Sequence, residues 1–107
     1  MISNKNSISF DLLCYLIADE VTIDDIGNEI KKSSEQECWC AELPVTATEF
    51  YKAGLMDIRP DITLKTLSEN YSGQKKARFN DIFYSVYRVY EDNKGYIYLY
   101  LTEKLGD

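Results

Sequence analysis

The sequence contains no histidine, and this absence excludes more chemistry than any other feature of its composition. Without imidazole there is no Ser-His-Asp or Cys-His catalysis and no zinc site that needs a histidine ligand. No side chain then has an ordinary pKa suited to acid-base work near neutral pH. We therefore expect a protein that is not an enzyme and that uses no cofactor.

Cysteine is scarce as well, with three residues in the chain. Three thiols cannot complete an all-cysteine tetrahedral zinc site, and an odd number without a secretory signal does not predict a disulfide framework. Cys38 and Cys40 could bind a soft metal together with Cys14 or Glu42, but one intervening residue is shorter than the usual metal-binding spacing. We expect no metal, and reduced thiols in a cytoplasmic protein.

Long hydrophobic runs are also missing. The longest near the N-terminus is Leu12 to Ala18, far below the roughly 20 residues that a membrane span needs. Asp11 interrupts the stretch that a secretory signal would require. With 45% apolar and 28% charged residues, the composition is typical of one globular domain over residues 1–107, with no membrane partner.

The N-terminal pattern predicts two helices. Apolar residues at helical spacing follow Ser9, a plausible N-cap, and predict a helix over residues 10–19. Thr22-x-x-Asp25 resembles a capping box and predicts a second helix over residues 23–32. Together with the strands below, these helices predict an α+β fold.

Two more helices are expected in the centre of the chain. Thr46-x-x-Glu49 is another capping box, which predicts a helix from Ala47 to about Lys52 that Gly54 closes. Asp61 is expected to cap a further helix that stops near Gly73. Residues 37–43 alternate in polarity and predict a short central strand before Pro44.

The C-terminal third predicts an antiparallel β-hairpin in a small sheet packed on helices. Residues 81–90 and 96–103 are rich in tyrosine and β-branched side chains, and residues 91–95 have the composition of a hairpin loop. The first of these segments also fits a helical face, but its β-branched and aromatic content favours a strand.

This hairpin is expected to carry a tyrosine ladder on one face, because successive side chains of a strand point to opposite faces. The ladder is predicted with Tyr90 opposite Tyr96. Either a helix covers it, or its tyrosines merely support cross-strand packing with their hydroxyls in water, or it is a recognition surface. Such an aromatic face could also stack single-stranded bases. As partner-binding residues from the hairpin we predict Tyr84, Arg88, Tyr90, Tyr96, Tyr98 and Tyr100.

The net charge of −6 arises entirely from the first 45 residues, which hold nine acids and three lysines; the remainder holds nine residues of each sign. An acidic helical face would steer a protein partner with a basic surface, or would merely keep the protein soluble. The predicted face comprises Asp19, Glu20, Asp24, Asp25 and Glu29.

Two alternative functions are weaker. Leu12 to Ile30 has the rhythm of a helix-turn-helix, and Lys75, Lys76 and Arg78 form a basic cluster, but the basic recognition helix is missing, so nucleic acid is a disfavoured partner. Pro60-Asp61 with Asp92-x-Lys94 imitates a metal-dependent nuclease pattern, although so short a pattern is common by chance.

The leading hypothesis is a small acidic cytoplasmic protein that inhibits or neutralises a macromolecular partner, in the manner of an immunity protein or a phage-encoded inhibitor. The partner is expected to be a protein. A homodimer is a further possibility, since an uncovered hairpin edge or tyrosine face can pair with a second copy.

Overall fold

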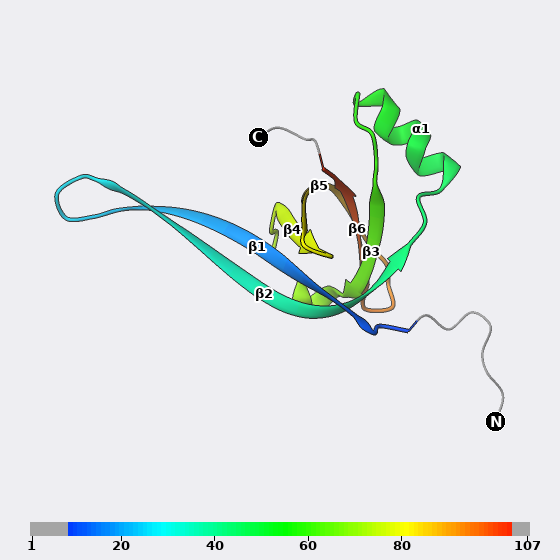
Figure 1. Cartoon of the computed structure of the whole chain (residues 1–107), viewed down its shortest axis with the longest axis horizontal. Coiled ribbons are helices and arrows are strands. Elements are labelled where there is room, and N and C mark those ends of the chain that lie inside the picture. The colour runs from blue at the N-terminus through cyan, green and yellow to red at the C-terminus, as the bar shows by residue number, and fades with distance from the viewer. Residues whose placement is uncertain (1–8, 104–107) are drawn as a thin grey trace.

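Six antiparallel strands close into a small β-barrel, from which one long hairpin projects (Figure 1). The computed structural model describes residues 9–103. The barrel order is β1-β2-β3-β6-β5-β4. Its strands are β1 (Leu12–Ile23), β2 (Glu29–Leu43), β3 (Ile62–Leu67), β4 (Lys76–Phe79), β5 (Ile82–Glu91) and β6 (Tyr96–Thr102).

The helix α1 (Ala47–Leu55) connects β2 to β3, and a short 3-10 helix (Ser68–Asn70) follows β3. Within the described residues α1 is the only α-helix, so the predicted α+β fold is wrong and the protein is mainly β. None of the described helices has the length and apolar character to cross a membrane.

The core fills the barrel interior with alternate side chains of its strands, as the pleat requires. Its members are mostly aliphatic or small, and the three cysteines lie among them. The cluster comprises Cys14, Leu16, Cys38, Cys40, Leu64, Ala77, Phe79, Tyr84, Ile97, Leu99 and Leu101.

The predicted helix over residues 10–19 is wrong, because this segment forms most of β1. Cys14 and Leu16 point into the core while Leu13 and Tyr15 remain partly exposed, which is the period of a strand. The outer face of the barrel is also apolar here, so the sequence forms one continuous apolar run. Such a run does not distinguish strand from helix.

The predicted helix over residues 23–32 is also wrong: this segment forms the turn of the long hairpin and the start of β2. Asp24 Oδ1 accepts hydrogen bonds from the backbone N–H groups of Ile26 (3.0 Å) and Asn28 (2.8 Å), and Gly27 has a φ of 87°. The carboxylate therefore caps a turn instead of a helix. Because Leu12 to Ile30 is a β-hairpin, the segment contains no helix-turn-helix.

The central predictions are partly confirmed. Residues 37–43 form the end of β2, and α1 begins where predicted, with the Thr46 hydroxyl accepting from Glu49 N (3.1 Å). Gly54 lies inside α1 and does not close it. The helix expected after Asp61 is wrong, because residues 62–67 form β3 with Leu64 and Thr66 buried inside the barrel.

The C-terminal hairpin is confirmed as β5 and β6, but its predicted register is wrong by two residues. Tyr90 lies opposite Tyr98, and Arg88 lies opposite Tyr100, with an irregularity between Val86 and Arg88. Asp92 Oδ1 accepts from Lys94 N (2.8 Å) and Tyr96 N (3.0 Å), which shortens the loop. The short strand β4 was not predicted.

β4 and β5 are joined by a two-residue turn. Asn80 (φ 53°) and Asp81 (φ 62°) both occupy the left-handed region, as the tightest hairpin turn requires, and Asn and Asp tolerate it best among residues other than glycine. β4 then pairs with residues Tyr15 to Ile17 of β1 and closes the barrel.

Candidate functional site

The most distinctive feature of the molecule is the outer part of the β1–β2 hairpin, which we call the arm and define as Ala18 to Ser34. β1 pairs with β4 only as far as Ile17, whereas its pairing with β2 continues to Ile23 opposite Glu29. The arm therefore leaves the barrel as an isolated two-stranded ribbon (Figure 1). The molecule measures 62 × 35 × 28 Å, and the arm points along the longest of these axes (Figure 1).

Large apolar side chains on the arm lie open to solvent. Val21 is 58% exposed, Ile23 72% and Ile26 81%, and Ile30 is also exposed. An isolated hairpin is only marginally stable in water, and apolar side chains stabilise a protein only when they are covered. An arm of this composition is typical of a surface that a partner covers.

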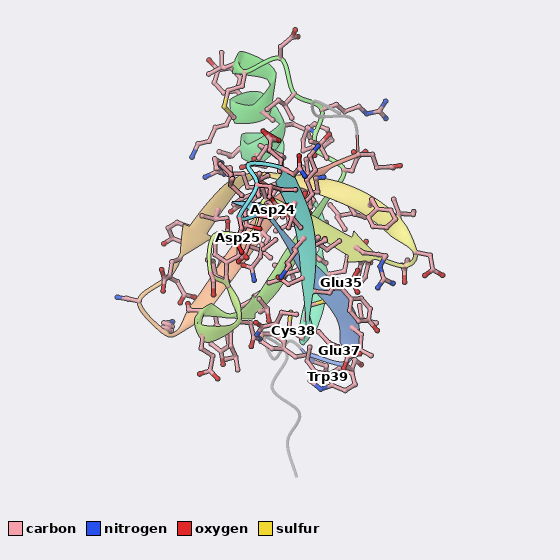
Figure 2. The ribbon with its side chains drawn as sticks, turned by 90° about the vertical axis from the view of Figure 1, so that its left-hand side faces the viewer. Asp24, Asp25, Glu35, Glu37, Cys38 and Trp39 are labelled. Atoms are coloured by element: carbon pink, nitrogen blue, oxygen red, sulfur yellow. The ribbon has the colours of Figure 1, made fainter. Side chains whose placement is uncertain are left out.

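The five predicted acidic residues all belong to the arm, although they lie on a hairpin instead of two helices. Asp19 and Glu20 are on β1, Asp24 and Asp25 are in the turn, and Glu29 begins β2. In Figure 2 the left-hand side of Figure 1 faces the reader, and Asp24 and Asp25 lie at the end of the arm. With Lys31 and Lys32 as its basic residues, the arm has a net charge of −3.

The base of the arm is fixed to the barrel by charge. Asp19 forms an ion pair with Lys76 of β4 (3.0 Å) and accepts a hydrogen bond from the Ser33 hydroxyl (3.0 Å). The Lys76 ammonium and the Ser33 hydroxyl hold the pKa of the Asp19 carboxyl below its usual value. These contacts are exposed, so they orient the arm more than they stabilise the fold.

The barrel wall beside the arm carries a second network. Tyr15 donates to Glu37 (2.9 Å), and the Arg78 guanidinium stacks on the Tyr15 ring (4.2 Å) while pairing with Glu35 (3.0 Å). Figure 2 shows Glu35, Glu37 and Trp39 in succession along β2. Trp39 is 56% exposed, so the wall presents an uncovered aromatic ring.

The basic cluster predicted as a nucleic-acid site is largely neutralised by these contacts. Lys76 pairs with Asp19, and Arg78 pairs with Glu35 and more loosely with Asp81 (3.9 Å). A phosphate backbone would have to compete with carboxylates for both cations. The geometry therefore adds nothing in favour of nucleic acid.

The tyrosine ladder has one covered end. Glu49 of α1 is 3% exposed, accepts from the Tyr87 hydroxyl (2.6 Å) and pairs with Arg88. The Arg88 guanidinium in turn lies 4.1 Å from the centre of the Tyr100 ring. Arg88 and Tyr100 therefore hold α1 against the barrel, and a helix does cover this part of the ladder.

The other end of the ladder remains open. Tyr90 is 53% exposed and packs against Tyr98, with 5.8 Å between ring centroids. Lys65 of β3 places its ammonium 4.6 Å from the centre of the Tyr96 ring and 5.2 Å from that of Tyr98. Tyr84 is separate from the ladder, because it is 7% exposed and belongs to the core.

The remaining sequence candidates do not form a site. Asp61 accepts from the Glu103 N–H (2.8 Å) near the far end of β6, whereas Asp92 caps the loop before Tyr96. Asp61 lies beside Leu101 of β6, and Asp92 lies beside Tyr96 of the same strand. Leu101 is five residues from Tyr96, which corresponds to about 17 Å at the rise of a strand. The two carboxylates therefore cannot share one metal ion.

The cysteines lie inside the barrel. Cys14 and Cys38 are opposite one another on β1 and β2, with 3.3 Å between their sulfur atoms, and neither is in a disulfide. Interaction with Cys38 and Cys40, together with burial, raises the pKa of the Cys14 thiol. Among residues 9–103 no group of cysteine and carboxylate side chains is arranged to hold a metal ion.

The exposed apolar residues of the arm are the part of the site that sequence reasoning missed. Ile23, Ile26 and Ile30 fall within the predicted helix over residues 23–32, whereas the structure places them on a hairpin and exposes them. The signal that could have identified the hairpin is the segment from Asp24 to Asn28, which contains Gly27 and separates two β-capable runs.

Comparison with known proteins assigns no family. No family model matches the sequence, and no curated protein matches it either.

Proposed function

We propose that the protein is a small cytoplasmic binding protein that inhibits or neutralises a protein partner by inserting its arm into a basic recess of that partner. One observation carries the proposal: the arm projects from a closed barrel with its carboxylates and its large apolar side chains uncovered. Val21, Ile23 and Ile26 supply apolar area that a partner would bury.

Charge supports the nature of the partner. The net charge of −3 on the arm, with two aspartates at its end, attracts a basic surface and accelerates the encounter. Shape supports the mode of action, because a two-stranded ribbon can enter a groove that is too narrow for the barrel. A ribbon lodged in such a groove would obstruct it.

The three unpaired cysteines support the cytoplasm as the compartment. Cys14 and Cys38 lie opposite one another with sulfur atoms 3.3 Å apart and without a bond between them. An odd number of cysteines does not suit a disulfide framework, and thiols stay reduced where glutathione and thioredoxin keep the redox environment reducing.

The first experiment locates the contact. A photo-crosslinking amino acid at position 26, at the end of the arm, should capture the partner in cells of the native host. The same amino acid at position 93, in the β5–β6 loop, is the control and should capture little of that protein. Capture at position 93 instead of position 26 would contradict the proposal.

The second experiment tests the role of charge on the captured partner after its purification. Asp24→Lys with Asp25→Lys should slow association by about tenfold at low salt and flatten its salt dependence, because both carboxylates contribute to electrostatic steering. Surface plasmon resonance at several salt concentrations measures both effects. Glu69→Lys with Glu91→Lys, two exposed positions outside the arm, changes the net charge equally and is the matched control. Unchanged association by the arm variant would refute the acidic-arm model.

A further inference from the structure

The two edges of the arm carry backbone groups that, among residues 9–103, pair with no neighbouring strand. In an antiparallel pair the N–H and C=O groups of successive residues point alternately toward the partner strand and away from it. The bond from Asp24 N to Asn28 O (2.9 Å) sets this alternation, so the even-numbered residues of β1 face β2. The backbone groups of Asp19, Val21 and Ile23 therefore point outward.

The outward edge of β1 continues the line of the β1–β4 ladder. β4 pairs with Tyr15, Leu16 and Ile17, and among the described residues no strand pairs with β1 on this side beyond Ile17. At the same point Lys75, which precedes β4, continues the pairing with β5, since its carbonyl accepts from Val86 N (2.9 Å). A cleft of about 360 Å³ lies between residues 17–19 and residues 72–76.

Charge distinguishes this edge from the opposite one. Asp19 and Glu20 lie on β1, and Asp24 and Asp25 follow it in the turn, with no basic residue among them. Both lysines of the arm lie on β2, whose outward edge is therefore less acidic. A second copy of the chain would bring the same acidic edge, and like charges on adjacent strands are destabilising.

The side chains along the β1 edge also differ between its two faces. Val21 and Ile23 lie on one face, and Glu20 and Thr22 lie on the other. A strand added beside them would place its own side chains directly opposite, in two alternating rows. The favourable pattern alternates β-branched apolar residues with basic residues.

We propose, on the basis of the arm's proposed role as the partner-binding element, that the outward edge of β1 accepts an extended segment of the partner as an added β-strand. The segment alternates β-branched and basic residues, and its end next to the barrel places a side chain in the cleft. Backbone hydrogen bonds to Asp19, Val21 and Ile23 supply affinity, and the charges select the edge.

The test uses two synthetic octapeptides, both blocked at their ends and both carrying four lysines. In the first, lysine alternates with valine; in the second, lysine alternates with proline, which cannot donate to a ladder. In a heteronuclear NMR titration the first peptide should shift the amides of Asp19, Val21 and Ile23 and slow the hydrogen exchange of these amides. It should bind about tenfold more tightly than the second, equivalent to one or two hydrogen bonds.

Substitutions at one cross-strand pair provide the controls, because Val21 and Lys31 lie opposite one another and both point their N–H groups outward. Val21→Pro should weaken binding of the lysine-valine peptide about tenfold, whereas Val21→Thr and Lys31→Pro should change it less than about threefold. Unchanged amide spectra for Leu64 and Leu99 show that each barrel is intact. If Val21→Pro disturbs the arm itself, the hydrogen exchange of Asp19, Val21 and Ile23 in the unsubstituted protein still tests whether the peptide adds a strand.

Each alternative outcome has a distinct meaning. Equal binding of both peptides would overturn strand addition and leave the acidic arm supported, because charge alone then holds the peptide. Loss of binding in Lys31→Pro alone would assign the strand to the opposite edge and overturn the inference. Self-association that protects the same amides without peptide would make a second copy the occupant. If neither peptide binds, the inference fails, whereas the acidic-arm function is decided separately by the association rate of the variant with Asp24→Lys and Asp25→Lys.

Discussion

At the scale of single residues, the buried carboxylate of Glu49 is the main link between the helix and the barrel. Its two oxygens bind Tyr87 and Arg88, and with 3% exposure it has little access to water. A buried charge is tolerated only when partners compensate for its lost hydration. Arg88 in turn is positioned by the Tyr100 ring, so three strand residues and one helix residue form a single unit.

This unit gives the first prediction of folding energetics. Glu49→Gln keeps the volume and removes the charge opposite Arg88, and it should lower the free energy of unfolding by about 1–2 kcal/mol, since Arg88 is partly solvated. Urea denaturation followed by circular dichroism measures the change. Glu69→Gln, at an exposed position, should change it by less than about 0.5 kcal/mol. Equal effects in both variants would contradict the anchoring role.

Residue chemistry also explains which local predictions succeeded. Thr46-x-x-Glu49 and Thr22-x-x-Asp25 both resemble capping boxes, yet Thr46 caps a helix while Asp24, inside the second pattern, caps a turn. A short polar side chain accepts the same backbone N–H groups in both settings. What separates the two is Gly27, whose positive φ turns the chain back on itself. Local capping signals therefore leave the choice of element to the residues around them.

At the scale of elements, the arm is separable from the barrel. Among its described contacts with the rest of the protein, the Asp19–Lys76 ion pair is exposed, and residues from Glu20 to Glu37 are exposed or half-buried. The core cluster lies wholly within the barrel strands. The fold should therefore not depend on the arm, and the arm is free to serve another purpose.

Shortening the arm tests this separation. Replacing residues 21–31 with Asn-Gly, a strong two-residue hairpin turn, joins the hydrogen-bonded pair Glu20 and Lys32 and should leave the barrel folded with a melting temperature within about 4 °C of the original, because little buried area is lost. Calorimetry and amide spectra of the core residues check the expectation. The shortened protein should also lose binding to the partner captured through position 26. Collapse of the barrel spectrum would show that the arm is part of the folding unit.

The elements differed in how far the sequence determined them. The C-terminal hairpin was predictable because Ile97, Leu99 and Leu101 alternate cleanly with tyrosines, so one face is visibly core. β1 was not predictable, because its outward-facing side chains near the barrel are also apolar and its half beyond Ala18 packs against no core. The acidic residues that we propose for partner binding stand out by their charge, while their placement on a hairpin required the strand pairing.

At the scale of the whole molecule, the tyrosines give the fold a defined response to alkali. Burial raises the pKa of Tyr71, Tyr84, Tyr87 and Tyr100 above the ordinary value, and the Glu49 carboxylate raises that of Tyr87 further. These groups bind their protons more tightly in the folded state than in the unfolded state. Their contribution to stability is therefore complete below about pH 10 and is lost as the pH rises through the folded pKa values.

The tyrosine contribution to the free energy of unfolding should accordingly be constant up to about pH 10 and then decrease, by up to about 1.4 kcal/mol per pH unit for each such tyrosine. Urea denaturation at a series of pH values measures the slope, and absorbance of tyrosinate reports the ionisation. Tyr87→Phe should make the decrease shallower because it removes the tyrosine hydrogen-bonded to Glu49. Tyr51→Phe, at an exposed position on α1, should keep the original slope. An identical slope in Tyr87→Phe would mean that this hydroxyl is solvated and that α1 does not cover the ladder.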